Sequence, residues 1–165
     1  MKKLISICIV LVTFLSVTSC GKDIEPGSAT RQFQLDFSDI MVAANGTGST
    51  AAQTLSLQQI LPNDYRNVKT SELQNNTSYL EITGLPEGAT LMDVKIVANG
   101  TEYAIGNVLA NQKLSTNTVL NHMGTIVQTL TQSKTVNVLL SYKGGNVPIS
   151  QGVTIKLFFD SYFTW

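Results

Sequence analysis

The sequence predicts a mainly β protein: an immunoglobulin-like antiparallel β-sandwich with one or two short helices. Apolar and polar residues alternate in several short runs, and glycine-rich or asparagine-rich turns separate these runs. Long helical segments do not alternate with the runs, as they would around a parallel sheet. Two antiparallel sheets packed face to face would give each run one buried face.

The chain begins with the pattern of a signal peptide over residues 1–19. Lys2 and Lys3 supply positive charge, and a mostly apolar run from Leu4 to Val17 follows them. A membrane-spanning helix needs about 20 apolar residues, and this run stops short of that length before a polar stretch. We therefore expect the segment to be removed.

At the end of this leader, Val17-Thr18-Ser19-Cys20 resembles the lipobox of bacterial lipoproteins. The resemblance implies that a signal peptidase recognises Val17, Thr18 and Ser19, cuts before Cys20, and leaves lipid on the cysteine. Two or more acyl chains are enough for stable anchoring, so the protein would be held to a membrane through Cys20. The alternative is a secreted protein with a cysteine there by chance.

The residues after the cysteine bear on which membrane holds the protein. Gly21 stands where enterobacterial lipoproteins retained in the inner membrane have aspartate, so the outer membrane is favoured. Lys22, Asp23 and Glu25 resemble the short export signal of Bacteroidetes lipoproteins, which implies exposure on the cell surface. The alternative is a solvated linker with incidental charges.

Two parts are expected after the leader. Residues 20–31 contain Pro26, Gly27 and Ser28 without an apolar period, so they predict a lipidated N-terminus and flexible tether. Residues 32–165 have the length of one domain and should form the sandwich.

The expected elements follow from local patterns. Asn99-Gly100 predicts a two-residue hairpin turn, because both residues tolerate a positive φ. Apolar residues at helical spacing predict a longer helix before the last two strands. In chain order, we expect a strand at 32–37, a short helix near 57–61 capped by Ser56 and ended by Pro62, strands at 79–83, 91–98 and 101–105, a helix from about Asn117, a strand at 136–142 and a final strand from Val153 onward.

The segment from Ser78 to Pro86, with the hairpin after it, resembles the small β-sandwich lipoproteins of Bacteroidetes, a family of unknown function. This similarity lies in the pattern of strands and turns. It implies the fold and carries no active-site residues.

Composition excludes several kinds of function. Once Lys2 and Lys3 are removed, acidic residues outnumber basic ones by two and no basic cluster remains, so we expect no nucleic-acid partner. Cys8 and Cys20 are the only cysteines, which excludes disulfides and thiol chemistry from the domain.

Residues able to carry catalysis or bind metal are scattered. His122 is the only histidine, and no Gly-x-Ser-x-Gly sequence is present. Asp36 and Asp39 lack the ordered spacing of a calcium loop, and Gly46-Thr47-Gly48 lacks the context of a dinucleotide site. We therefore expect no enzyme activity, no metal and no cofactor.

The aromatic C-terminus is the one surface on which we predict a ligand or partner. Phe158 and Tyr162 should face away from Phe159 on the last strand, and Trp165 ends the chain. Exposed aromatic residues bind sugars and proteins. The alternative is that Phe158 and Tyr162 lie under a loop or the helix and complete the core, because large apolar patches are uncommon on monomers.

These observations favour a membrane-anchored, non-enzymatic surface lipoprotein that acts as a binding or structural accessory module, with an unknown protein or glycan partner. One alternative is a carbohydrate-binding component of a glycan-uptake system. Another is a fimbrial subunit, since fimbrillins resemble the chain in being lipoproteins with sandwich domains, which would imply maturation after an arginine such as Arg31.

Overall fold

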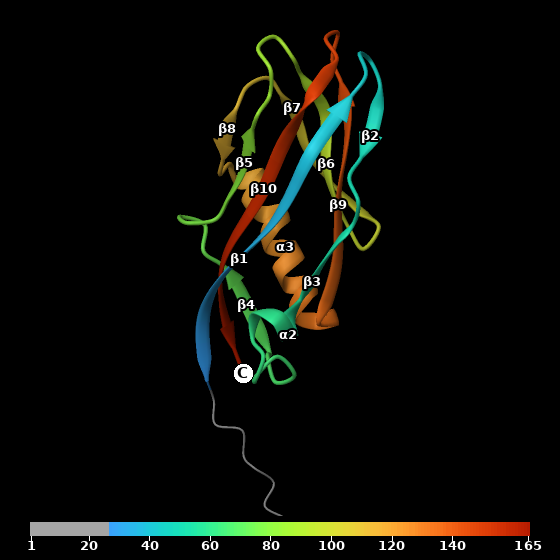
Figure 1. Cartoon of the computed structure of the whole chain (residues 1–165). Coiled ribbons are helices and arrows are strands. Elements are labelled where there is room, and N and C mark those ends of the chain that lie inside the picture. The colour runs from blue at the N-terminus through green and yellow to red at the C-terminus, as the bar shows by residue number, and fades with distance from the viewer. Residues whose placement is uncertain (1–26) are drawn as a thin grey trace, which may run out of the picture.

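A computed structural model describes residues 27–165, which form two antiparallel sheets packed face to face (Figure 1). The predicted β-sandwich is confirmed, but the immunoglobulin-like strand arrangement is not. The leader and the predicted anchor at Cys20 lie outside the described residues.

The first sheet, sheet A, has the order β1-β10-β5-β8, and β4 also pairs with β10. Its strands are β1 (Ser28–Val42), β4 (Thr70–Leu73), β5 (Tyr79–Thr83), β8 (Gln112–Leu114) and β10 (Ile149–Thr164). The second, sheet B, has the order β2-β9-β6-β7, and β3 also pairs with β9. Its strands are β2 (Thr47–Ser49), β3 (Gln53–Ser56), β6 (Leu91–Ala98), β7 (Thr101–Val108) and β9 (Thr135–Gly144).

The hairpin between β6 and β7 is the one predicted from Asn99-Gly100. The two residues have φ values of 47° and 84°, as a tight turn requires. The second strand continues to Val108, beyond the expected end at residue 105.

Strand β1 begins earlier than expected. Ser28 to Arg31 pair with the end of β10, and Gly27 exchanges backbone hydrogen bonds of 3.1 and 3.0 Å with Trp165. The predicted tether over residues 20–31 is therefore wrong at its C-terminal end, because pairing with β10 makes a strand of residues that have no apolar alternation. The start of the described chain and the C-terminus lie at the same end of the sandwich (Figure 1).

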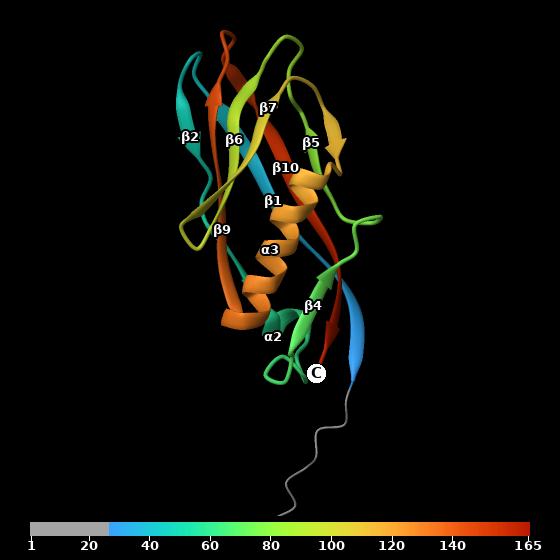
Figure 2. The same cartoon turned by 180° about the vertical axis from the view of Figure 1, so that it is seen from behind.

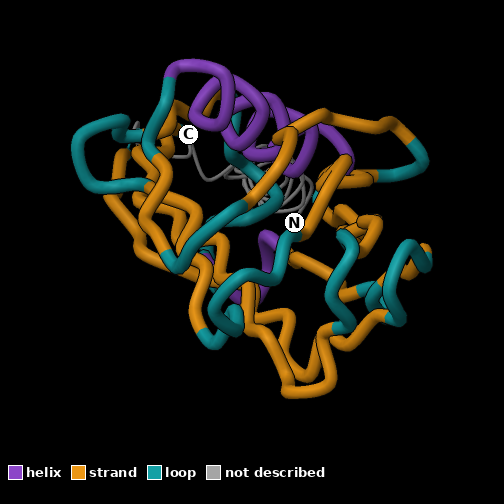
Figure 3. The backbone as a smooth tube through the Cα atoms, turned by 90° about the horizontal axis from the view of Figure 1, so that it is seen from above, coloured by secondary structure: helices purple, strands orange, loops and turns teal. Residues whose placement is uncertain are grey.

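Two helices complete the described part. The short helix α2 (Leu57–Ile60) forms as predicted, although Ser56 makes no side-chain capping hydrogen bond. The longer helix α3 (Asn117–Ser133) begins where expected, and Thr116 caps it by accepting a hydrogen bond from the backbone N–H of Val119. Helix α3 contacts β4 of sheet A and β9 of sheet B. It therefore covers one side of the sandwich (Figures 2 and 3).

The core lies between the sheets and under α3. Phe159 and Phe163 of β10 are fully buried, and Phe33 stacks on Phe159 with ring centroids 5.0 Å apart. Alternate residues of β10 point to the other side of sheet A. Helix α3 lies behind this sheet in the view of Figure 1, so the outer side of sheet A is free of helices in the described structure.

Candidate functional site

The outer side of sheet A, called face A below, carries a row of four charged residues. Asp36 of β1 is opposite Lys156 of β10, Lys156 is opposite Glu81 of β5, and Glu81 is opposite Lys113 of β8. Residues that pair across antiparallel strands point to the same side of the sheet. The signs therefore alternate across four strands, and we call this set the charge row.

Only one contact in the charge row is an ion pair, between Lys156 Nζ and Asp36 Oδ1 at 4.0 Å. Asp36 also accepts a hydrogen bond of 2.7 Å from the Gln34 side chain. Glu81 and Lys113 form no ion pair with any part of residues 27–165. These two charges are thus left without an oppositely charged contact in the described chain.

Beside the charge row lies an aromatic pair, Tyr79 of β5 and Phe158 of β10. The two rings stack with centroids 5.0 Å apart and planes 14° apart. Lys113 Nζ lies 3.9 Å from the centroid of the Tyr79 ring, which is a cation–π contact. Since Phe158 and Lys113 both lie over the ring of Tyr79, this pair offers little free ring face to a sugar.

The structure separates the three aromatic residues predicted as a binding surface. Phe158 and Tyr162 share face A, with Phe158 half-buried in the aromatic pair and Tyr162 37% exposed. Trp165 is half-buried and packs against the core, beside Gly27. The structure therefore does not bring Trp165 together with the other two, because Trp165 follows the inward alternation of Phe163.

Between Phe158 and Tyr162 lies Asp160, a buried residue that the sequence analysis did not single out. Its Oδ2 accepts a hydrogen bond of 3.1 Å from the Gln32 side chain, while Oδ1 has no partner within the described residues. The hydroxyl of Ser78 accepts from the backbone N–H of Asp160 at 3.0 Å. These contacts hold the loop before β5 against β10, so the rim of face A is well fixed.

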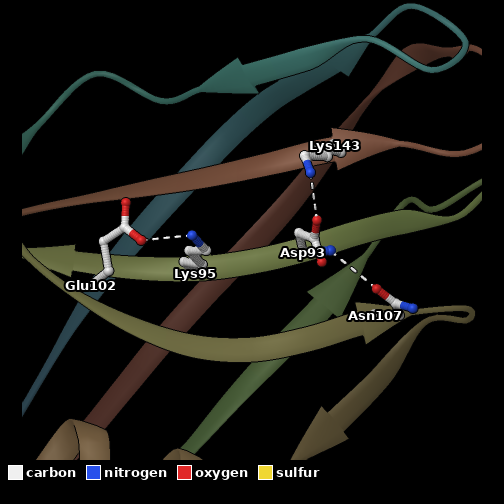
Figure 4. Close-up of polar contacts among 5 residues, drawn as sticks. All are labelled: Asp93, Lys95, Glu102, Asn107 and Lys143. Atoms are coloured by element: carbon white, nitrogen blue, oxygen red, sulfur yellow. Dashed lines mark hydrogen bonds and ion pairs between the residues drawn. The ribbon is translucent and has the colours of Figure 1, made fainter.

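The outer side of sheet B carries a different set of charges (Figure 4). Lys143 Nζ lies 2.7 Å from Asp93 Oδ2, and Lys95 Nζ lies 2.6 Å from Glu102 Oε2. The hydrogen bond and charge of Lys143 hold the pKa of Asp93 below its ordinary value, and Glu102 raises the pKa of Lys95 in the same way. Asn107 accepts from the backbone N–H of Asp93 at 3.1 Å. Each charge is neutralised by its neighbour.

Asp93 has a φ of 48° at an irregularity in the pairing of β6. Such a conformation is costly for a residue other than glycine. The contacts to Lys143 and Asn107 stabilise it. We therefore attribute this cluster to the local geometry of the sheet.

A polar groove follows the contact between α3 and β4. It consists of two adjoining hollows of about 240 and 380 Å³ that share Ser71 and Gln128. Its side-chain amides and hydroxyls include those of Asn75, Asn121, Thr125, Gln128, Thr131 and Gln132. Ser71 and Thr131 are hydrogen-bonded at 2.8 Å, so α3 is fixed directly to β4 at the floor of the groove. The sequence alone gave no signal for this groove, since its two walls are far apart in the chain.

The remaining candidates from the sequence do not come together. His122 lies with Nε2 3.2 Å from the carbonyl oxygen of Ala104 and packs against Tyr103. Asp39 lies at a register shift in β1. Residues 27–165 contain no group of three potential metal ligands. Within that range, no helix has the length and apolar character needed to cross a membrane.

The chain matches no protein-family model, no curated protein and no solved structure.

Proposed function

We propose that the mature protein is a lipid-anchored, non-enzymatic accessory module of the outer membrane, and that it docks a protein partner through face A. The observation that carries this proposal is that one uncovered sheet face combines an aromatic pair, the exposed Tyr162 and an incompletely neutralised charge row. Aromatic residues are enriched in protein interfaces, and complementary charges across an interface give it specificity.

The anchor part of the proposal is supported by the resemblance of Val17-Thr18-Ser19-Cys20 to a lipobox. A tether before Gly27 would reach the domain at one end, where Gly27 pairs with Trp165. Face A runs along the length of the sandwich from that end (Figure 1), so it would stand beside the tether, open to neighbours in the membrane.

Lipid attachment is tested with Cys20→Ala. We expect this variant to lose incorporation of labelled fatty acid and to leave the membrane fraction, because no other cysteine remains after cleavage. Unchanged labelling would refute the anchor.

Docking through face A is tested on intact cells with the photo-crosslinker benzoylphenylalanine in place of Tyr162. A matched chain carries it in place of Lys143, on the outer side of sheet B. We expect one discrete product from position 162 that Glu81→Lys abolishes, and no such product from position 143. Equal products from the two faces, or none from either, would overturn docking through face A.

A second candidate, binding of a glycan, is favoured by the groove between α3 and β4. Its lining is rich in uncharged amides and hydroxyls, which suit a ligand made of hydroxyl groups. In a polysaccharide screen, Gln128→Ala should weaken a hit about tenfold, and Gln151→Ala, exposed elsewhere on β10, should not. A screen without hits would remove this candidate.

A further inference from the structure

The order of signs in the charge row has a geometric property. From β1 to β8 it reads negative, positive, negative, positive, for Asp36, Lys156, Glu81 and Lys113. Read in the opposite direction, every sign is reversed. Two such rows placed face to face in opposite directions therefore match at all four positions.

A two-fold axis produces this placement when it runs parallel to the strands, between β10 and β5. It sets β1 of one copy over β8 of the other, and β10 over β5. Asp36 then faces Lys113 of the second copy, and Lys156 faces Glu81. A two-fold interface uses the same patch on both copies, so it requires this kind of self-complementarity.

The same axis also places the aromatic pairs of the two copies against each other. Phe158 and Tyr79 are opposite each other on β10 and β5, so Phe158 of one copy would face Tyr79 of the other. Strands in facing sheets prefer to lie within about 30° of each other, and this axis keeps them aligned. The aromatic pair would lie near the axis, with the outer members of the charge row farther from it.

We propose that the protein partner of face A is a second copy of this chain, bound face to face about this axis. The inference rests on the proposed docking function and names its partner.

An arrangement within one chain explains only part of the charge row. It accounts for the 4.0 Å contact between Lys156 and Asp36, but it leaves Glu81 and Lys113 without ion pairs among the described residues. The row as a whole is neutral, so it creates no strong field to attract a polyanion. Matching to a reversed copy supplies a partner for each of the four charges.

The test uses charge reversal in the full chain, purified in a density-matched detergent and studied by sedimentation equilibrium. In Glu81→Lys, like charges meet twice across the axis, and the same holds for Lys156→Glu. Each variant alone should self-associate at least about tenfold more weakly than the native chain, because like charges oppose each other. A mixture of the two should associate within about threefold of native, since opposite charges again meet at both positions.

Rescue by mixing separates the interface from folding, because a second chain does not repair a misfolded first one. Lys143→Glu, the matched reversal on the outer side of sheet B, should leave self-association unchanged. The proposal is overturned if the native chain is monomeric, if the single reversals have no effect, if mixing gives no rescue, or if Lys143→Glu weakens association equally.

Failure of the self-association and failure of face A docking are distinguishable. A monomeric native chain whose position-162 crosslink contains a different protein would refute the second copy and retain docking through face A. A crosslinked product with the mass of two copies supports both.

Discussion

The charge row on face A and the two ion pairs on the outer side of sheet B use their charges differently. On sheet B, Lys95 pairs with Glu102 and Lys143 with Asp93, at 2.6 and 2.7 Å, so the charges are neutralised within the chain. On face A, the only ion pair among residues 27–165 is the longer Lys156–Asp36 contact. Surface pairs contribute little to stability in either place, so what differs is which charges remain available to another molecule.

The two sheets also differ in where they place aromatic residues. Tyr79 and Phe158 stand on face A, partly exposed. Tyr142 of sheet B is buried, and its ring lies across Gly48, which has no side chain to obstruct it. Sheet B therefore buries the ring of Tyr142, whereas sheet A presents three aromatic residues on its outer side, Tyr79, Phe158 and the exposed Tyr162. This contrast is the reason for assigning the docking role to face A.

The largest expected effect on stability comes from a comparison of two adjacent residues of β10, Phe159 and Phe158. Phe159→Ala should lower the free energy of unfolding by about 3–5 kcal/mol, because it removes a fully buried ring that stacks on Phe33. Phe158→Ala removes a half-buried ring and should cost about 1–2 kcal/mol, because an aromatic pair contributes about 0.5–1.5 kcal/mol in addition to the area it buries. Urea denaturation of both variants measures the difference. Equal losses would mean that Phe158 belongs to the core, and face A would lose its central residue.

A smaller effect is expected on sheet B from Gly48→Ala. A Cβ at this position would lie 2.7 Å from Cε2 of Tyr142, so the ring must shift from its buried position. We expect a loss of about 1–3 kcal/mol by urea denaturation, as for other overpacked sites. Combining Gly48→Ala with Tyr142→Leu removes the ring and should abolish the added cost of the alanine. If Gly48→Ala alone is neutral, Tyr142 does not depend on the missing side chain.

The sequence was sufficient for the features that depend on local pattern. Alternation along the last strand correctly placed Phe159 and Phe163 inside and Phe158 and Tyr162 outside. The turn at Asn99-Gly100 followed from backbone preference alone. Such features need only neighbours in the chain.

The charge row was not predictable in the same way. Asp36, Glu81, Lys113 and Lys156 come from four strands, and their order depends on the register of each pairing. Shifting one strand by a single residue would move its charge to the other side of the sheet. Long-range pairing also explains the early start of β1 at Ser28, where the local sequence indicated a tether.

The smallest effect concerns the neutralised charges of sheet B. Because Lys143 lowers the pKa of Asp93, the carboxylate contributes stability above its ordinary pKa of 3.8, and this contribution is lost as the pH falls below that value. The Asp93 carboxyl carbon, followed by NMR, should titrate below pH 3.8 in the native chain and at a higher pH in Lys143→Met. The control is Lys156→Met on face A, which should leave the Asp93 midpoint unchanged because Lys156 lies on the other sheet. An Asp93 midpoint that does not respond to Lys143→Met would show that the pair is open in solution, and the contrast between the two faces would fail.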